Sequence, residues 1–211
     1  MVKANGFDTG SGKFSVHDWI TYCKSHYKKI GIRTSDSIFE IGCGAGAFLF
    51  LLYEKQHAVA GIDYSSELIK LANKFMPKAN FKETDATSFS QDQKYDVIIS
   101  HGVFFYFESL QYAEEVAKRM INAAVKKIAI LDICDFDKKE IYHEVRISKF
   151  IEEGHTEDEY WKHYEGLDHL FYTKDFFRDL GKQHNLNTEI YDQNYQNYEN
   201  SKLRFNVIYT K

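Results

Sequence analysis

The sequence is 211 residues long, with 44% hydrophobic and 16% aromatic residues and a formal net charge of -4. This length fits one domain better than two, and the apolar content excludes a disordered chain. The lysines are scattered rather than grouped. The sequence therefore argues against a surface that follows the phosphate backbone of a nucleic acid.

No segment has the character of an export signal or a membrane span. The N-terminal residues 1–15 contain no apolar stretch, and the longest apolar run, residues 48–53, is far shorter than the roughly 20 residues that cross a bilayer. Cys23, Cys43 and Cys134 form no C-x-x-C pair, which argues against a disulfide framework or a zinc site. We therefore expect a cytoplasmic protein, monomeric or homodimeric, without membrane contact and without a bound metal.

Short β-type segments alternate with helical patterns from residue 36 onward, which is typical of a parallel sheet with crossover helices. Helical patterns are present at residues 15–30, 46–55, 65–77, 109–125 and 173–184. Seven strands are predicted, at residues 37–41, 58–63, 80–84, 96–100, 128–132, 188–191 and 205–210. The predicted fold class is α/β, with a doubly wound, seven-stranded, mostly parallel sheet.

Residues 135–172 interrupt this alternation with a charged helical stretch that is rich in histidine and tyrosine. It contains no clear strand and is longer than the usual connections of such folds. We interpret it as a small helical cap inserted over the active site, within a single domain that spans residues 1–211. Residues 192–201, rich in Asn and Gln, are predicted to form a long loop.

A glycine-rich turn, Glu40-Ile41-Gly42-Cys43-Gly44-Ala45-Gly46, follows the first predicted strand. Such a turn offers free backbone N–H groups, and its glycines let a ligand come close. It also satisfies the G-x-G-x-x-G/A pattern of dinucleotide-binding folds. Glu40 favours another ligand, because an acidic side chain is unfavourable beside a pyrophosphate but suits the ammonium group of a methionine moiety.

Acidic residues also end the second and third predicted strands. Asp63 is placed where a carboxylate accepts hydrogen bonds from the two hydroxyls of a ribose. Asp85 is placed where a carboxylate accepts from the amino group of an adenine. Three acidic residues that end three successive strands therefore predict a site for an adenosine cofactor.

The motifs I-F-E-I-G-C-G-A-G-A-F, V-A-G-I-D-Y-S, T-D-A and Y-D-V-I-I-S-H-G-V-F follow one another between residues 36 and 132. In this order they resemble the motif set of the class I S-adenosylmethionine-dependent methyltransferases. The resemblance implies a Rossmann-like methyltransferase fold with an antiparallel last strand, the cofactor S-adenosyl-L-methionine and the product S-adenosyl-L-homocysteine. The chain departs from the family at residues 125–127, where Val-Lys-Lys replaces the usual Pro-Gly-Gly turn.

The resemblance also implies roles for residues at matching positions. The glycines would line the methionine end of the cofactor, Asp63 the ribose, and Asp85 with Ala86 the adenine, while Tyr64 would pack on the adenine ring. The complete predicted cofactor set is Glu40, Gly42, Cys43, Gly44, Gly46, Asp63, Tyr64, Ser65, Asp85, Ala86, Thr87, Ser100, His101 and Gly102.

Methyl transfer to a hydroxyl requires alignment of the acceptor, exclusion of water and removal of a proton. Histidine suits the last task near neutral pH. The candidates for the base are His101, which follows the fourth strand, and the cap residues His143 and His169. A structural role in the floor of the pocket is the alternative for His101.

Polar and aromatic residues near the expected acceptor position are candidates for substrate binding. His143 and Arg146 share a helix face, which would suit an acceptor that carries phosphate or carboxylate, although an exposed polar face is the common alternative. Arg204 and Asn206 lie on one side of the last strand. The complete candidate set is Tyr22, Tyr106, Asp135, Arg146, Tyr172, Arg204 and Asn206.

These observations predict an enzyme that methylates a hydroxyl of a small polar metabolite such as a sugar or cell-envelope precursor, with an amine as the second choice. The cap and the C-terminal segment are similar to those of bacterial methyltransferases that modify such molecules. Pro77 is the only proline, so the proline-containing motifs of DNA methyltransferases are absent. The alternatives are a protein methyltransferase, a binding module that holds S-adenosylmethionine without catalysis, and an NAD-dependent oxidoreductase.

Overall fold

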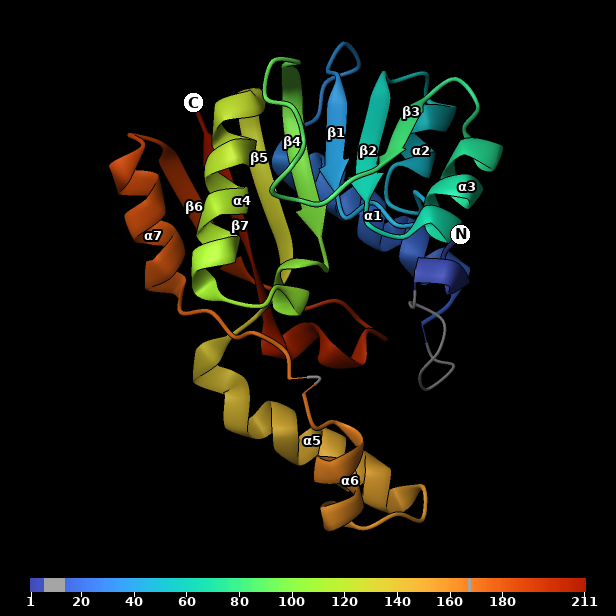
Figure 1. Cartoon of the computed structure of the whole chain (residues 1–211), viewed down its shortest axis with the longest axis vertical. Helices are drawn as coiled ribbons and strands as arrows, with labels where there is room; N and C mark the ends of the chain where they lie inside the picture. Colours follow the sequence, from blue (N-terminus) through green and yellow to red (C-terminus); the bar gives the residue numbers. More distant parts are fainter. Residues whose placement is uncertain (6–13, 167) are drawn as a thin grey trace.

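The structure is a computed structural model that describes residues 1–5, 14–166 and 168–211. Seven strands form one sheet in the order β3-β2-β1-β4-β5-β7-β6 (Figure 1). The strands β1 to β5 pair in parallel, and β7 is antiparallel to both of its neighbours, which confirms the predicted fold class and the antiparallel last strand. The strands are β1 (Ile38–Ile41), β2 (Val59–Asp63), β3 (Asn80–Glu83), β4 (Tyr95–His101), β5 (Ala124–Cys134), β6 (Asn187–Asp192) and β7 (Arg204–Thr210).

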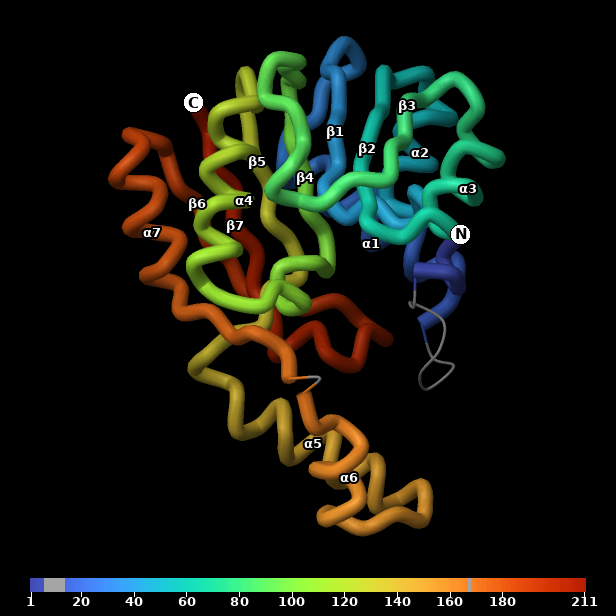
Figure 2. Tube along the Cα trace, viewed as in Figure 1, coloured from blue at the N-terminus to red at the C-terminus, as the bar shows by residue number. Residues whose placement is uncertain are grey.

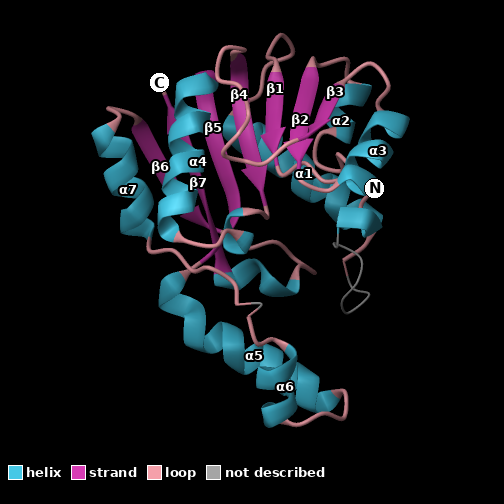
Figure 3. Ribbon diagram, in the orientation of Figure 1, coloured by secondary structure: helices cyan, strands magenta, loops and turns pink. Residues whose placement is uncertain are grey.

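Helices cover both faces of the sheet (Figure 3). On one face, α4 (Leu110–Ala123) and α7 (Lys174–Gln183) pack with Ile98, Ile130 and Val207 into one apolar core. On the other, α1 (Val16–Ile30), α2 (Phe50–Glu54) and α3 (Ser66–Phe75) contribute to a second core that contains Ile99 and Leu131. Adjacent strand residues point to opposite faces, so each central strand is buried on both sides.

Two predicted helix boundaries are wrong. The helix expected over residues 46–55 begins only at Phe50, because Gly46 adopts a left-handed φ of 79° that no α-helix accommodates. The helix expected over residues 109–125 ends at Ala123, and β5 begins at the next residue. The backbone of Ala124 already pairs with Tyr95 of β4, so residues 124 and 125 belong to the sheet and not to the helix.

The C-terminal loop also differs from the prediction. The segment expected to be an irregular loop over residues 192–201 contains the start of a 3-10 helix, η4 (Glu199–Leu203), which leads directly into β7.

Between β5 and α7 lie a 3-10 turn, η3 (Phe136–Lys138), and two helices, α5 (Lys139–Glu152) and α6 (Glu157–His163). We call residues 136–171 the cap. It extends away from the edge of the sheet at which the parallel strands end (Figure 2). The two ends of the cap are joined, because the N–H of Phe136 donates to the carbonyl of Tyr172 and the N–H of Tyr172 donates to that of Cys134.

At the opposite edge of the sheet, one lysine holds the starts of β1 and β4 together. The Nζ atom of Lys126 lies 2.7 Å from Oδ1 of Asp36 and 2.8 Å from Oδ1 of Asp96. Asp96 also accepts from the N–H and hydroxyl of Ser37. The hydrogen bond from Lys126, followed by that from the Ser37 backbone, lowers the pKa of Asp96 to about 2.

Replacement of Asp96 by Asn should lower the free energy of unfolding by about 1 to 2 kcal/mol near neutral pH. Because the folded-state pKa is depressed, this contribution is present above the unfolded-state pKa of about 4 and is lost as pH falls through about 2. Urea denaturation at several pH values should therefore show the difference from the unaltered protein shrinking on acidification. Asp92→Asn, at an exposed position before β4, is the control; a difference for Asp96→Asn that is independent of pH would contradict the argument.

Candidate functional site

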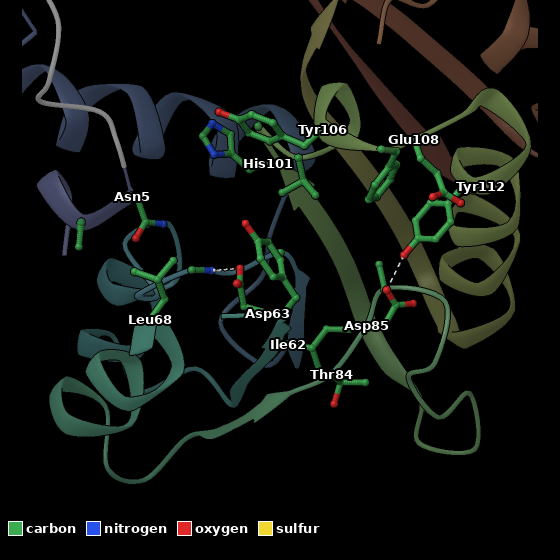
Figure 4. Close-up of a pocket in the computed structure, with 18 residues that line it drawn as sticks. Asn5, Ile62, Asp63, Leu68, Thr84, Asp85, His101, Tyr106, Glu108 and Tyr112 are labelled. Atoms are coloured by element: carbon green, nitrogen blue, oxygen red, sulfur yellow. Dashed lines mark hydrogen bonds between the residues drawn. The ribbon is translucent and has the colours of Figure 1, made fainter. Parts of the chain in front are cut away.

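A cavity of about 480 Å³ opens where β1, β2, β3 and β4 end (Figure 4). Its volume lies in the range of about 300 to 1,000 Å³ that is usual for small-molecule sites. Eight of the predicted cofactor residues line it: Gly42, Gly44, Asp63, Tyr64, Asp85, Ala86, His101 and Gly102.

The glycine turn approaches the cavity through a backbone that only glycine adopts readily. Gly42 and Gly44 have φ values of 70° and 53°. A Cβ atom on Gly42 would lie 2.3 Å from Cγ2 of Val103. The turn therefore presents bare backbone to the cavity because both the conformation and the available space exclude a side chain.

Asp63, at the end of β2, fixes the glycine turn and the start of α3. Its Oδ2 accepts from the N–H of Gly44 at 2.8 Å, and its Oδ1 accepts from the N–H of Ser65 at 2.9 Å. Ser65 in turn caps α3 by accepting from the N–H of Leu68. Figure 4 shows Asp63 in the middle of the lining residues, between Asn5 and Leu68 on one side and Tyr112 on the other.

Asn5 supports the glycine turn from the N-terminal segment. Its side-chain oxygen accepts from the N–H of Ala45 at 2.9 Å, and its amide nitrogen donates to the carbonyl of Cys43 at 3.3 Å. Residues that are far apart in the sequence thus build one wall of the cavity.

Asp85, after β3, forms the opposite end of the cavity. It accepts from the hydroxyl and N–H of Thr87 at 2.5 and 2.8 Å, and from the hydroxyl of Tyr112 at 2.7 Å. The Thr87 hydroxyl, with Tyr112, lowers the pKa of Asp85. An ionised carboxylate has about four acceptor positions, so Asp85 keeps capacity for a further donor.

His101, the last residue of β4, lines the cavity and is only 6% exposed. Its Nε2 lies 2.8 Å from the hydroxyl of Tyr22 in α1, and that hydroxyl donates to Oε1 of Gln193 at 3.0 Å. With the Tyr22 proton directed to Gln193, His101 is the donor in the bond between the two rings. Burial lowers the pKa of His101 to about 3, so its imidazole is neutral near pH 7.

Six other predicted cofactor residues do not line the cavity. Gly46 serves packing, because a Cβ there would lie 2.2 Å from Cε of Met76. The Ser100 hydroxyl donates to the carbonyl of Ile41 between neighbouring strands. Glu40 is buried, and burial followed by the nearby Asp63 raises its pKa. The remaining three, with roles in the turn or in bonds to Asp63 and Asp85, are Cys43, Ser65 and Thr87.

The three candidate bases occupy different places. His101 lies at the cavity, whereas His169 packs against Tyr106, a lining residue, at 5.3 Å between ring centroids. Burial lowers the pKa of His169 to about 4, and its Nδ1 is 2.7 Å from the hydroxyl of Tyr142. His143 lies farther out in the cap, beside the rings of Trp161 and Phe171.

The substrate-binding candidates lie in four different places. Tyr172 and Asp135 hold the base of the cap: the Tyr172 hydroxyl donates to the carbonyl of Phe104, and Asp135 is buried beside Lys138 and Lys174. Tyr22 lies behind His101 rather than at the cavity. Tyr106 lines the cavity, and the remaining candidates lie beyond it in the cap and in β7: Arg146, Arg204 and Asn206.

Sequence reasoning missed about half of the lining. Several missed residues follow His101 and Gly102 in the connection to α4, and the place of that connection at the sheet edge was a usable signal. Asn5 gave no signal, because no motif or periodicity surrounds it. The missed lining residues are Ala4, Asn5, Ile62, Leu68, Thr84, Val103, Phe107, Glu108 and Tyr112.

The family description "Methyltransferase domain" matches residues 32–199, and the chain belongs to that family. A putative methyltransferase 235L of Invertebrate iridescent virus 6 is 32% identical over 79 residues, which are 36% of this chain and 30% of that protein. A malonyl-[acyl-carrier protein] O-methyltransferase of Priestia megaterium is 37% identical over 78 residues, which are 35% of this chain and 28% of that protein. The matched segment thus spans less than a third of both relatives.

Solved structures share the fold over nearly the whole chain. The magnesium protoporphyrin IX methyltransferase of Synechocystis PCC 6803 with bound S-adenosylmethionine has a TM-score of 0.64 at 12% identity, covering 100% of this chain and 93% of that one. The N-methyltransferase NodS of Bradyrhizobium japonicum WM9 with S-adenosylhomocysteine has a TM-score of 0.65 at 13% identity, covering 99% and 97%. Family and fold define a class I methyltransferase, and the cofactor of this class is S-adenosylmethionine.

Two further observations concern the described residues only. None of their helices is both long and apolar enough to cross a membrane. Cys23, Cys43 and Cys134 are all buried and free.

The glycine turn can be tested with a matched pair of substitutions. Gly42 and Gly154 both have a left-handed φ, but a Cβ on Gly154 would meet nothing within 4 Å. Gly154→Ala should therefore cost about 1 kcal/mol of stability from the backbone alone, whereas Gly42→Ala should cost about 2 to 4 kcal/mol because overpacking against Val103 is added.

Chemical denaturation measures both costs, and calorimetry measures the affinity for S-adenosylhomocysteine. Only Gly42→Ala should weaken that affinity. Equal stability costs for the two variants would show that the contact with Val103 is easily relieved.

Proposed function

We propose that this chain transfers a methyl group from S-adenosylmethionine to a hydroxyl of a small polar metabolite. The observation that carries the proposal is the position of His101, which lines the cavity at the end of β4, close in the fold to the glycine turn after β1. A neutral imidazole is able to accept the proton that a hydroxyl loses on methylation.

The described residues fit the cofactor. In the proposed arrangement, the bare backbone of Gly42 and Gly44 receives the methionine end and Asp63 accepts from the ribose. Asp85 then accepts from the adenine. The buried Oε2 of Glu40 has no hydrogen-bond partner among the described residues. Burial raises the pKa of Glu40, and the ammonium group of the methionine end would supply the opposite charge that favours its ionised form.

When bound, S-adenosylmethionine supplies an electrophilic methyl group and a neutral thioether as leaving group. Transfer to the acceptor oxygen would replace the C–S bond by a C–O bond, with the electron pair of the C–S bond left on sulfur. The chain contributes alignment of the acceptor with the methyl group, exclusion of water and removal of the hydroxyl proton. In our proposal His101 takes that proton, and its bond to Tyr22 holds the ring in place.

The residues near the proposed acceptor position favour a small molecule over a macromolecule as the methyl acceptor. Tyr106, 71% exposed, lies between the cavity and the cap, and the cap packs against it through His169. The scattered lysines and the net charge of -4 disfavour nucleic acid. The three free, buried cysteines suit the cytoplasmic location that we propose for the protein.

The cofactor assignment predicts that S-adenosylmethionine and S-adenosylhomocysteine bind the purified protein in a calorimetric titration, whereas NADH does not. Asp63→Ala should weaken binding by about a hundredfold or more, because it removes the ribose acceptor and frees the glycine turn at Gly44. Asp63→Asn, which keeps one acceptor oxygen, should lose less. Unchanged affinity in Asp63→Ala, or binding of NADH alone, would overturn the assignment.

The role of His101 predicts a loss of turnover without a loss of cofactor. Transfer of a labelled methyl group to a panel of hydroxylated and amino metabolites should fall by about a hundredfold in His101→Asn, while affinity for S-adenosylhomocysteine is retained. Because the pKa of His101 is about 3, the ring is already neutral at pH 5 and stays so to pH 8.

The transfer rate of the unaltered protein should therefore show no titration near the usual histidine pKa of about 6.5. His17→Asn, at an exposed position on α1, is the control and should retain full activity. Labelling of amines alone would show that the acceptor atom is nitrogen. Full activity of His101→Asn would exclude His101 as the base.

A further inference from the structure

A buried arginine that pairs with no carboxylate of the described residues lies next to the candidate active site. Arg204 is the first residue of β7, and its side chain is 2% exposed. Its Nη1 contacts Sγ of Cys134, and its guanidinium lies 4.4 Å from the ring centroid of Phe105 and 5.4 Å from that of Tyr142. Sulfur and aromatic faces do not neutralise a buried cation, which ordinarily requires a hydrogen-bonded anion.

Unused donors surround this charge. The Nε atom of Arg204 and the Nδ2 atom of Asn206 are both buried without a hydrogen-bond partner among the described residues. The two residues are two positions apart on β7, so their side chains leave the strand on the same side. Two donors without acceptors on one side of a strand call for oxygen atoms of a ligand.

A second guanidinium reaches the same tyrosine from the cap. Arg146 donates to the hydroxyl of Tyr142 at 2.9 Å and lies 4.2 Å from the ring centroid of Tyr164. Among the residues that the structure describes, Arg119 and Arg178 pair with carboxylates, whereas Arg146 and Arg204 do not. Two positive charges without a carboxylate partner among the described residues thus lie next to Tyr142.

The nearby carboxylate of Asp132 is committed elsewhere. Its Oδ1 accepts from Nε2 of Gln193 at 2.6 Å and its Oδ2 accepts from the hydroxyl of Tyr198 at 2.7 Å. Asp132 attracts Arg204 at longer range but forms no ion pair with it within the described part of the chain. The positive charge of Arg204 therefore remains available to a ligand.

The arginine is connected to the cavity through aromatic contacts. Phe105 packs on Tyr106 at 4.3 Å between ring centroids, and Tyr106 lines the cavity. Tyr142 of the cap also contacts Arg204, with 5.4 Å between its ring centroid and the guanidinium. A ligand that reaches Arg204 would therefore lie between the cavity and the cap, where the acceptor of the proposed reaction has to lie.

We infer that the methyl acceptor carries a carboxylate, and that Arg204 binds this carboxylate while Arg146 adds positive charge from the cap. This inference rests on the proposed function, since it names the class of acceptor for the same site. The planar fork of a guanidinium matches a carboxylate with two parallel hydrogen bonds. The guanidinium lies against the rings of Phe105 and Tyr142, and a flat carboxylate in the plane of the fork adds less bulk beside these rings than a tetrahedral phosphate.

The experiment uses the full chain saturated with S-adenosylhomocysteine and measures binding by NMR titration and by the shift in melting temperature. The probes are acetate and benzoate, with benzamide as the uncharged match of benzoate and inorganic phosphate as the other anion. Acetate and benzoate should bind and raise the melting temperature, whereas benzamide and phosphate should not.

Arg204→Met should weaken binding of benzoate by about tenfold to a hundredfold. The same variant should keep the affinity for S-adenosylhomocysteine and melt no lower than the unaltered protein, because it removes a buried charge that has no partner. Arg204→Lys keeps the charge but not the fork and should bind benzoate with intermediate affinity. Arg178→Met, on the exposed side of α7, is the control and should bind benzoate normally.

Each outcome decides one question. Equal benzoate affinity in Arg204→Met, or no binding of either carboxylate to protein that does bind S-adenosylhomocysteine, would overturn the inference and leave the proposed function standing. Binding of phosphate but not of carboxylates would overturn the choice of anion. Failure of S-adenosylhomocysteine itself to bind would refute the proposed function and the inference together.

Discussion

The site depends on one carboxylate. Both oxygens of Asp63 are bound by the chain itself, one to the glycine turn at Gly44 and one to the start of α3 at Ser65. β1 and β2 pair in parallel, so Asp63 ends its strand beside the turn that ends the neighbouring one. A cofactor that bonds to Asp63 therefore meets a side chain already fixed by backbone donors, which lowers the entropic cost of binding.

On the other side of the cavity, a buried polar network fixes the orientation of His101, as the backbone donors fix Asp63. It runs from His101 through Tyr22 and Gln193 to Asp132, and so joins β4, α1, the C-terminal loop and β5. Asp132 adopts a left-handed φ of 61°, a conformation that a non-glycine residue keeps only when its surroundings fix it. The ring of His101 is thereby oriented by residues that never touch the cavity.

The sequence predicted the parts of this arrangement that rest on local rules. The fold class and the places of Asp63, Asp85 and His101 follow from alternating elements and from residues at strand ends, and the antiparallel last strand follows from the family resemblance. The start of α2 and the end of α4 were wrong, because Gly46 and the pairing of Ala124 with Tyr95 override helical periodicity. Asn5 and Tyr112 reach the cavity only through tertiary contacts, and no short-range pattern reveals such contacts.

The same distinction between local sequence rules and tertiary contacts separates the cofactor side of the site from the acceptor side. The proposed cofactor residues lie in backbone turns and at strand ends, which a sequence displays directly. In our proposal the acceptor side is formed by the 3-10 helix η2 (Phe104–Tyr106), the cap and β7, and its chemistry depends on a positive charge that no carboxylate of the described residues pairs with. An arginine in a sequence is ordinarily a surface residue; only the structure shows that Arg204 is buried against Phe105, Tyr142 and Cys134 and that it pairs with no carboxylate of the described residues. In our inference that uncompensated charge, rather than any motif, is what limits the acceptor to an acid.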